Sequence, residues 1–147
     1  MASRPNLVVG AVVGFVAVLA VVAGIVSATR HAATYEPGTP VAVVQAYLAA
    51  VVDGDHEAAA AHLSSESPCT VDDLDRAFLA GGVRAVLRDS RVDGDTAQVR
   101  VDLIRSTGGP LDMSEYSEKV TFRLIRAGGA WRITGSPWPM FECGKGA

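Results

Sequence analysis

A run of 22 residues without a charged side chain, Leu7 to Ala28, follows the first six residues of this sequence. As a helix the run would be roughly 33 Å long, and a bilayer hydrocarbon core is about 30 Å thick. It therefore predicts a transmembrane helix over residues 7–28, after a short cytoplasmic N-terminus at 1–6. The alternative is a signal peptide cleaved near Ala28, although signal peptides usually have only about 7–15 apolar residues.

Residues 29–39 are small and polar and include glycine and proline, so they predict a linker. Such a linker reaches at most about 40 Å when fully extended, which would keep the domain at 40–147 close to the membrane. Arg4 precedes the apolar run and Arg30 follows it. Because the positive charges are balanced in this way, their count does not settle the orientation of the helix.

The part of the chain after residue 35 is acidic. It holds all 16 acidic residues, and it holds 11 of the 13 basic ones because only Arg4 and Arg30 precede it, which gives a net charge of about −5. A nucleic-acid partner requires a basic face, so we expect none. The same balance disfavours a surface that lies on anionic lipid.

Apolar residues at helical spacing predict three helices, over residues 40–53, 56–64 and 70–80. Thr39 and Asp55 precede the first two helices and Thr70 begins the third, and all three are residue types that cap helix starts. Pro40 occupies a favoured first position of the first helix. Gly54 ends that helix, and a glycine pair at 81–82 ends the third.

The period then changes to two, which predicts strands around residues 83–92, 98–103, 115–126 and 130–135. The inward-facing residues are expected to be Val83, Ala85, Leu87, Val99, Val101, Leu103, Val120, Phe122, Leu124, Trp131 and Ile133. The segment DGD at 93–95 predicts a hairpin turn. Four antiparallel strands covered by three helices make an α+β domain.

The helix pair VVQAYLAAVVDGDHEAAAAHLS, joined through Gly-Asp, and the GGAWRI that opens the last strand resemble the nuclear-transport-factor-like superfamily. That is the α+β cone shared with ketosteroid isomerase and polyketide cyclases, and also found as anchored envelope domains of high-GC bacteria. The resemblance implies a curved sheet around the first helix, with a pocket at its open end that enzymatic members line with an acid, a histidine or a tyrosine. No motif matches such a residue by position, so no catalytic residue is assigned.

Tyr47, His62 and Tyr116 are the candidate polar groups of such a pocket, with ordinary packing as the alternative. No metal site is expected, because His56 and His62 are six residues apart and do not form the i, i+4 pair of a zinc site. The two DGD segments lack the ligand pattern of a calcium loop. No cofactor is expected either.

The two cysteines, Cys69 and Cys143, are expected to form a disulfide if the domain lies outside the cytoplasm. The segment SPWPMF would then be an ordered strap, with Trp138 and Phe141 packed on the helical layer. The alternative is a frayed tail with two free thiols. The disulfide also decides the orientation of the anchor that the flanking charges leave open.

In the apolar run, Gly10 and Gly14 form a G-x-x-x-G pattern that lets two helices approach closely, so they are a candidate transmembrane dimer face.

The sequence as a whole predicts a single-pass envelope protein whose extracytoplasmic domain is non-catalytic and binds a protein partner or a small apolar ligand. The alternatives are a small-molecule isomerase, dehydratase or cyclase that uses a pocket acid or base, and a secreted domain released at Ala28.

Overall fold

The computed structural model describes residues 34–77, 82–106 and 115–144. Residues from Tyr35 onward form one compact unit. The predicted transmembrane helix at 7–28 and its candidate dimer face at Gly10 and Gly14 lie outside the described residues. Among the residues that are described, no helix has the length and apolar character needed to span a membrane.

The described residues form three helices, α2 (Pro40–Asp53), α3 (His56–Ala60) and α4 (Val71–Arg76). Helix α2 has the predicted bounds: the Thr39 hydroxyl accepts the Ala42 N–H at 3.2 Å, and Gly54 ends the helix with a φ of 75°. That left-handed backbone suits glycine, which has no Cβ to clash.

Helix α3 ends at Ala60, four residues before the predicted end, because the chain that follows pairs with the sheet. The Ile133 N–H donates to the His62 carbonyl at 2.9 Å, and the Ser64 N–H donates to the Ile133 carbonyl at 2.7 Å. These bonds require extended backbone and therefore stop the helix. Helix α4 also ends early, since Ala77 already has an extended conformation.

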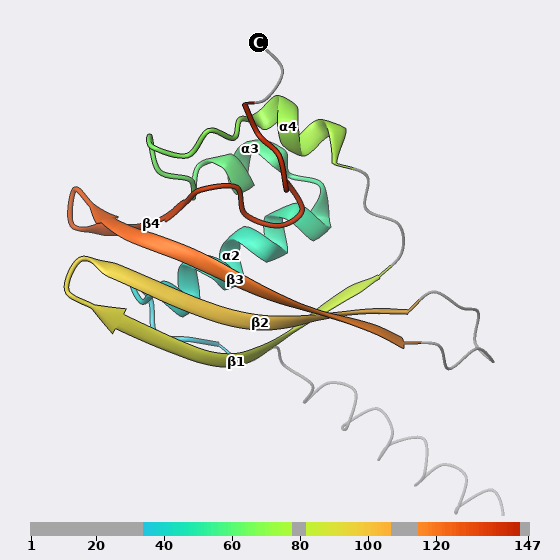
Figure 1. The fold of residues 1–147 in the computed structure, drawn as a ribbon, viewed down its shortest axis with the longest axis horizontal. Coiled ribbons are helices and arrows are strands. Elements are labelled where there is room, and N and C mark those ends of the chain that lie inside the picture. The colour runs from blue at the N-terminus through green and yellow to red at the C-terminus, as the bar shows by residue number, and fades with distance from the viewer. Residues whose placement is uncertain (1–33, 78–81, 107–114, 145–147) are drawn as a thin grey trace, which may run out of the picture. The chain divides into compact units, whose positions relative to one another are not determined.

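The sheet has four strands in the order β1 (Val83–Asp93), β2 (Thr96–Ser106), β3 (Glu115–Ala127) and β4 (Ala130–Thr134), all antiparallel. This confirms the α+β fold class predicted for the domain. In Figure 1 the helices lie together on one side of the sheet, which we call the inner face. The opposite side is the outer face.

The core lies between α2 and the inner face. Val44, Tyr47, Leu48 and Val51 of α2 are buried, as are alternate residues of the sheet such as Val99, Leu103, Phe122, Leu124 and Ile133. The Tyr47 and Phe122 rings meet edge to face, with centroids 5.9 Å apart. Alternation in β2, β3 and β4 thus buries the residues that their sequence pattern predicts.

The chain after β4 returns as a strap, residues 135–144, on the helical side of the sheet (Figure 1, dark red). Trp138 and Met140 are buried in the core, and Cys143 forms a disulfide with Cys69. Phe141 is 65% exposed, so its predicted packing on the helical layer is wrong. A tight turn, closed by the Met140 N–H and the Pro137 carbonyl at 2.8 Å, directs Met140 inward instead.

Candidate functional site

The three candidate pocket residues line neither described hollow, and they share no hydrogen bond or ring contact with one another. Tyr47 is fully buried in α2 and its hydroxyl donates to the Trp138 carbonyl at 2.9 Å, while burial raises its pKa. His62 lies half-buried after α3, where burial and the Arg132 guanidinium lower its pKa. Tyr116 is 60% exposed on β3. Ordinary packing, the alternative for these residues, fits Tyr47 best.

The strap builds a polar cluster on the inner face that the sequence pattern did not single out. The Arg105 guanidinium lies 5.5 Å from the Trp138 ring centroid, and its Nη2 is 3.5 Å from a Glu118 carboxylate oxygen. Arg105 Nε and Trp138 Nε1 are buried and have no hydrogen-bond partner among the described residues. The sequence holds one indication of this cluster: the alternation of the strands places two charged residues, Arg105 and Glu118, at inward-facing positions.

A hollow of about 310 Å³ opens on the outer face of the sheet. It is lined by Arg88, Asp89, Arg100, Asp102, Lys119 and Thr121, together with Val101 and Val120. A β-bulge between Leu87 and Asp89 leaves Arg88 unpaired in the ladder. Arg88 and Asp89 therefore both reach the outer face, where they form ion pairs with β2.

These ion pairs set the electrostatics of the hollow. Arg88 donates to the Asp102 carboxylate through Nε, at 2.7 Å, and through Nη2, and Arg100 Nε lies 3.1 Å from Asp89. The Asp102 side chain is only 6% exposed. The hydrogen bonds from Arg88 hold the pKa of Asp102 below its ordinary value, and the charge of Lys119 lowers it further.

The lowered pKa of Asp102 predicts how the variant Asp102→Asn depends on pH. A carboxylate whose pKa is lower in the folded chain stabilises the fold above its unfolded pKa of about 3.9, and that contribution is lost as the pH falls through the folded pKa. The wild type should therefore be the more stable protein at neutral pH, and the two should converge in acid. Urea denaturation across the acidic range measures this, and a difference that did not shrink in acid would contradict it.

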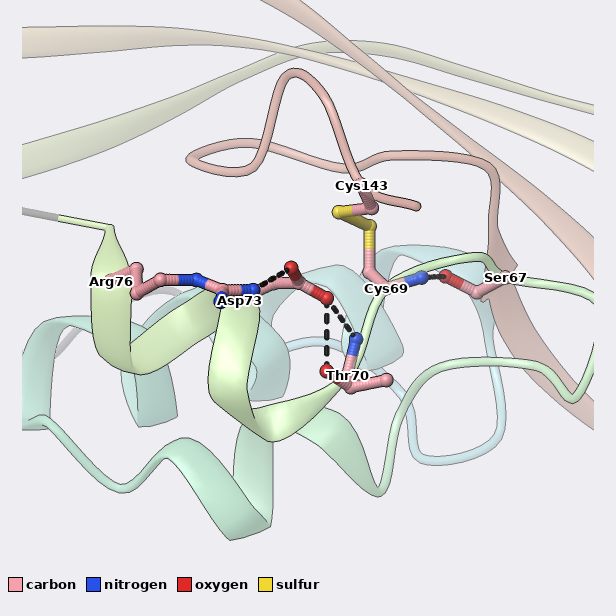
Figure 2. Close-up of polar contacts among 6 residues, drawn as sticks. All are labelled: Ser67, Cys69, Thr70, Asp73, Arg76 and Cys143. Atoms are coloured by element: carbon pink, nitrogen blue, oxygen red, sulfur yellow. Dashed lines mark hydrogen bonds and ion pairs between the residues drawn. A yellow bond between two sulfur atoms is a disulfide. The ribbon is translucent and has the colours of Figure 1, made fainter. Parts of the chain in front are cut away.

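A second hollow, of about 610 Å³, lies between α4 and the strap, and we call it the α4–strap groove. Figure 2 shows the disulfide joining the two sides, with Cys69 before α4 and Cys143 on the strap. The Asp73 carboxylate accepts hydrogen bonds from the Thr70 N–H at 2.8 Å and the Thr70 hydroxyl at 2.9 Å, and it also pairs with Arg76 (Figure 2). These contacts fix the start of α4 and hence that side of the groove.

Histidine is used structurally on the helical side, where His56 Nδ1 pairs with the Asp75 carboxylate and so joins α3 to α4. In the part of the chain that the structure describes, no three His, Cys, Asp or Glu side chains are grouped to hold a metal ion. The candidate site thus consists of the two surface hollows and the polar cluster at Trp138.

No family model matches the sequence, and no curated protein matches it. Among solved structures, the chain is similar to a SEC-C motif containing protein from Rhodopseudomonas palustris, with a TM-score of 0.57 and 17% identity over 69% of this chain and 79% of that one. The chain shares its fold with that protein. At this identity the likeness extends to the fold alone.

Two further solved structures are described as NTF2-like, the superfamily that the sequence resembles. One, of unknown function, is from Pseudomonas putida, with a TM-score of 0.49 and 15% identity over 63% of this chain and 78% of that one. The other, with a cystatin-like fold, is from Novosphingobium aromaticivorans, with a TM-score of 0.45 and 20% identity over 63% and 73%. Both TM-scores are below 0.5, so membership of the superfamily stays a prediction.

Proposed function

We propose that this chain is a membrane-anchored, extracytoplasmic and non-catalytic binding domain of the bacterial cell envelope, of the nuclear-transport-factor-like type, and that it binds a protein partner. The observation that carries the proposal is that large side chains occupy the part of the interior that the structure describes. Tyr47, Phe122 and Trp138 occupy it, each at most 1% exposed, and none of them lines either described hollow. This filling favours a partner at the surface over a small apolar ligand inside the cone.

The enzyme alternative requires an acid or base held in a pocket. Of the titratable groups described on the inner side, Tyr47 donates to the Trp138 carbonyl, and Glu118 faces Arg105. His62 is half-buried but lines neither described hollow. The buried carboxylate, Asp102, is on the outer face and is neutralised by Arg88. An isomerase, dehydratase or cyclase is therefore the weaker hypothesis.

The α4–strap groove is the surface that we assign to the partner. It combines apolar residues, among them Pro139 and the exposed Phe141, with the acidic residues Asp72 and Glu142. Exposed aromatic residues at the edge of a hollow are typical anchors of protein interfaces. The groove would suit a segment of a partner that carries apolar and basic side chains.

Extracytoplasmic placement is supported by the disulfide, because disulfides persist in oxidising compartments and are rare in the cytosol. The uncharged run at 7–28 would supply the anchor, and the linker at 29–39 would hold the domain near the membrane.

Site-specific photocrosslinking of the full chain in cells tests the partner surface. With a photoreactive phenylalanine in place of Phe141, we expect a discrete adduct with a second protein in the membrane fraction. Val92 is also exposed, but it lies on β1 away from the groove, so the same substitution there is the matched control. Absence of an adduct at Phe141, or equal adducts at both positions, would contradict the proposed surface.

A further inference from the structure

Charge is distributed very unevenly along the folded domain. Residues 34–77, which carry the helices, contain eight acidic residues and one arginine, whereas the four strands contain nine basic and five acidic residues. The net charge of about −5 is therefore the sum of an acidic helical layer and a basic sheet. Such a sum does not show which charge either side presents to a partner.

The basic residues of the sheet gather on its outer face. Residues paired across neighbouring strands lie on the same face, and the register pairs Asp102 with Lys119, Arg100 with Asp89 and Thr121, and Gln98 with Arg91 and Arg123. With Arg88 from the bulge, these three adjacent rows present five cations: Arg88, Arg91, Arg100, Lys119 and Arg123. We call these rows the basic sheet face.

Two acids on this face, Asp89 and Asp102, are both taken up by ion pairs with Arg100 and Arg88. Arg91, Lys119 and Arg123 have no ion-pair partner among the described residues and are exposed to solvent. The face thus keeps an excess of three positive charges. Arg84 and Asp93 lie beyond the rows at the two ends of β1, and their opposite charges leave this excess unchanged.

We propose that the basic sheet face docks on the anionic phospholipid headgroups of the membrane in which the protein is anchored. The inference rests on one part of the proposed function, the N-terminal anchor. The short linker that follows the anchor would hold the domain within reach of the bilayer. Cations spaced over an open sheet match a surface of phosphate groups. The hollow on this face carries three cations, Arg88, Arg100 and Lys119, against the two carboxylates of Asp89 and Asp102, so it keeps a net positive charge where a headgroup phosphate would lie. The acidic helical layer would be repelled by the same surface.

Two other anionic partners fit the face less well. Proteins that bind single-stranded nucleic acid stack bases on aromatic side chains, and these three rows present none. An acidic protein segment would match the charge, but the apolar side chain that these rows offer is Val86, opposite Asp102, and not the large aromatic anchor that protein interfaces usually contain. Docking on lipid would also turn the α4–strap groove away from the bilayer, where a partner can reach it.

The test uses the domain from residue 35 onward, which forms a compact unit with its own core and disulfide. Its sedimentation is measured with vesicles of phosphatidylcholine alone and of phosphatidylcholine with phosphatidylglycerol. We expect binding only to the anionic vesicles, lost in high salt. The variant Arg91→Gln, Lys119→Gln, Arg123→Gln should bind at least about tenfold more weakly.

Single variants separate the face from total charge. Lys119→Gln should weaken vesicle binding a few-fold, roughly in line with one lost cation. Arg76→Gln removes the same charge from α4 on the helical side and should leave binding unchanged. Unchanged circular dichroism and thermal unfolding establish that both variants are folded.

The outcomes distinguish this inference from the proposed function. If the domain ignored anionic vesicles, or if Arg76→Gln weakened binding as much as Lys119→Gln, the lipid face would be overturned whatever the full chain did. Binding to polyglutamate without binding to vesicles would overturn it in favour of an acidic protein. If instead the domain bound vesicles but salt also washed the full chain from cell membranes, the face would stand and the anchor of the proposed function would fail.

Discussion

Replacing Trp138 by alanine is expected to lower the free energy of unfolding by about 3–5 kcal/mol, the usual effect of truncating a fully buried large aromatic side chain. Trp138 is 1% exposed, its carbonyl accepts the Tyr47 hydroxyl, and its ring lies against the Arg105 guanidinium. The variant would leave a large cavity between the strap and α2. Urea or guanidinium denaturation of the domain measures the change.

Phe141→Ala is the matched control, because Phe141 lies on the same strap and is mostly exposed. Its effect should stay within about 0.5 kcal/mol, as for other surface substitutions. If Trp138→Ala is too unstable to measure, Trp138→Phe should show a smaller loss in the same direction. A Trp138→Ala protein as stable as the Phe141→Ala protein would show that the strap does not close the core.

Removing the disulfide with the paired substitutions Cys69→Ser and Cys143→Ser should have the second large effect. The two cysteines are 74 residues apart, so the bond closes a long loop and strongly restricts the unfolded chain. The expected loss in the free energy of unfolding is about 2–5 kcal/mol. Equilibrium denaturation with and without a reducing agent measures it.

Reduction supplies an internal control for this prediction. Reduced wild-type domain should lose about as much stability as the double serine variant, and a reducing agent should not affect the variant further. Wild-type stability that is insensitive to reduction would show either that the cysteines are unpaired or that their bond adds nothing to the fold.

Local signals predicted most of the fold. Thr39 and Gly54 bound α2 because one supplies a capping hydroxyl and the other a left-handed backbone, and both effects act within a few residues. Alternation predicted the buried side of β2, β3 and β4, because the side-chain period of a strand is fixed by its backbone. The hairpin at Gly94 followed from its turn residues.

Features that depend on distant contacts were not predicted. The end of α3 is decided by pairing of residues 62–64 with β4, and nothing in HEAAAAHLS itself stops a helix at Ala60. Likewise Met140 rather than Phe141 faces the core, because a turn at Pro137 sets the direction of the strap. Hydrophobicity alone cannot choose between two adjacent apolar residues.

The candidate site was harder to predict than the fold. Tyr47, His62 and Tyr116 were grouped by chemistry, but a pocket is made by tertiary geometry, and none of the three lines a described hollow. The basic sheet face was hidden because net charge averages over both layers. Its cations alternate with buried residues along β2 and β3, yet the bulge that adds both Arg88 and Asp89 to one face is not evident from the pattern.

The state of the two cysteines in the full chain, isolated from cell membranes, tests the account most directly. Unreduced membranes are denatured in iodoacetamide, and the chain is then cleaved and mapped by mass spectrometry. We expect one linked peptide pair joining Cys69 to Cys143, together with peptides from residues 7–28 that show a retained anchor. Alkylation of both cysteines in membrane-bound protein would contradict the disulfide that holds the strap. It would thereby also contradict an extracytoplasmic location of the binding domain.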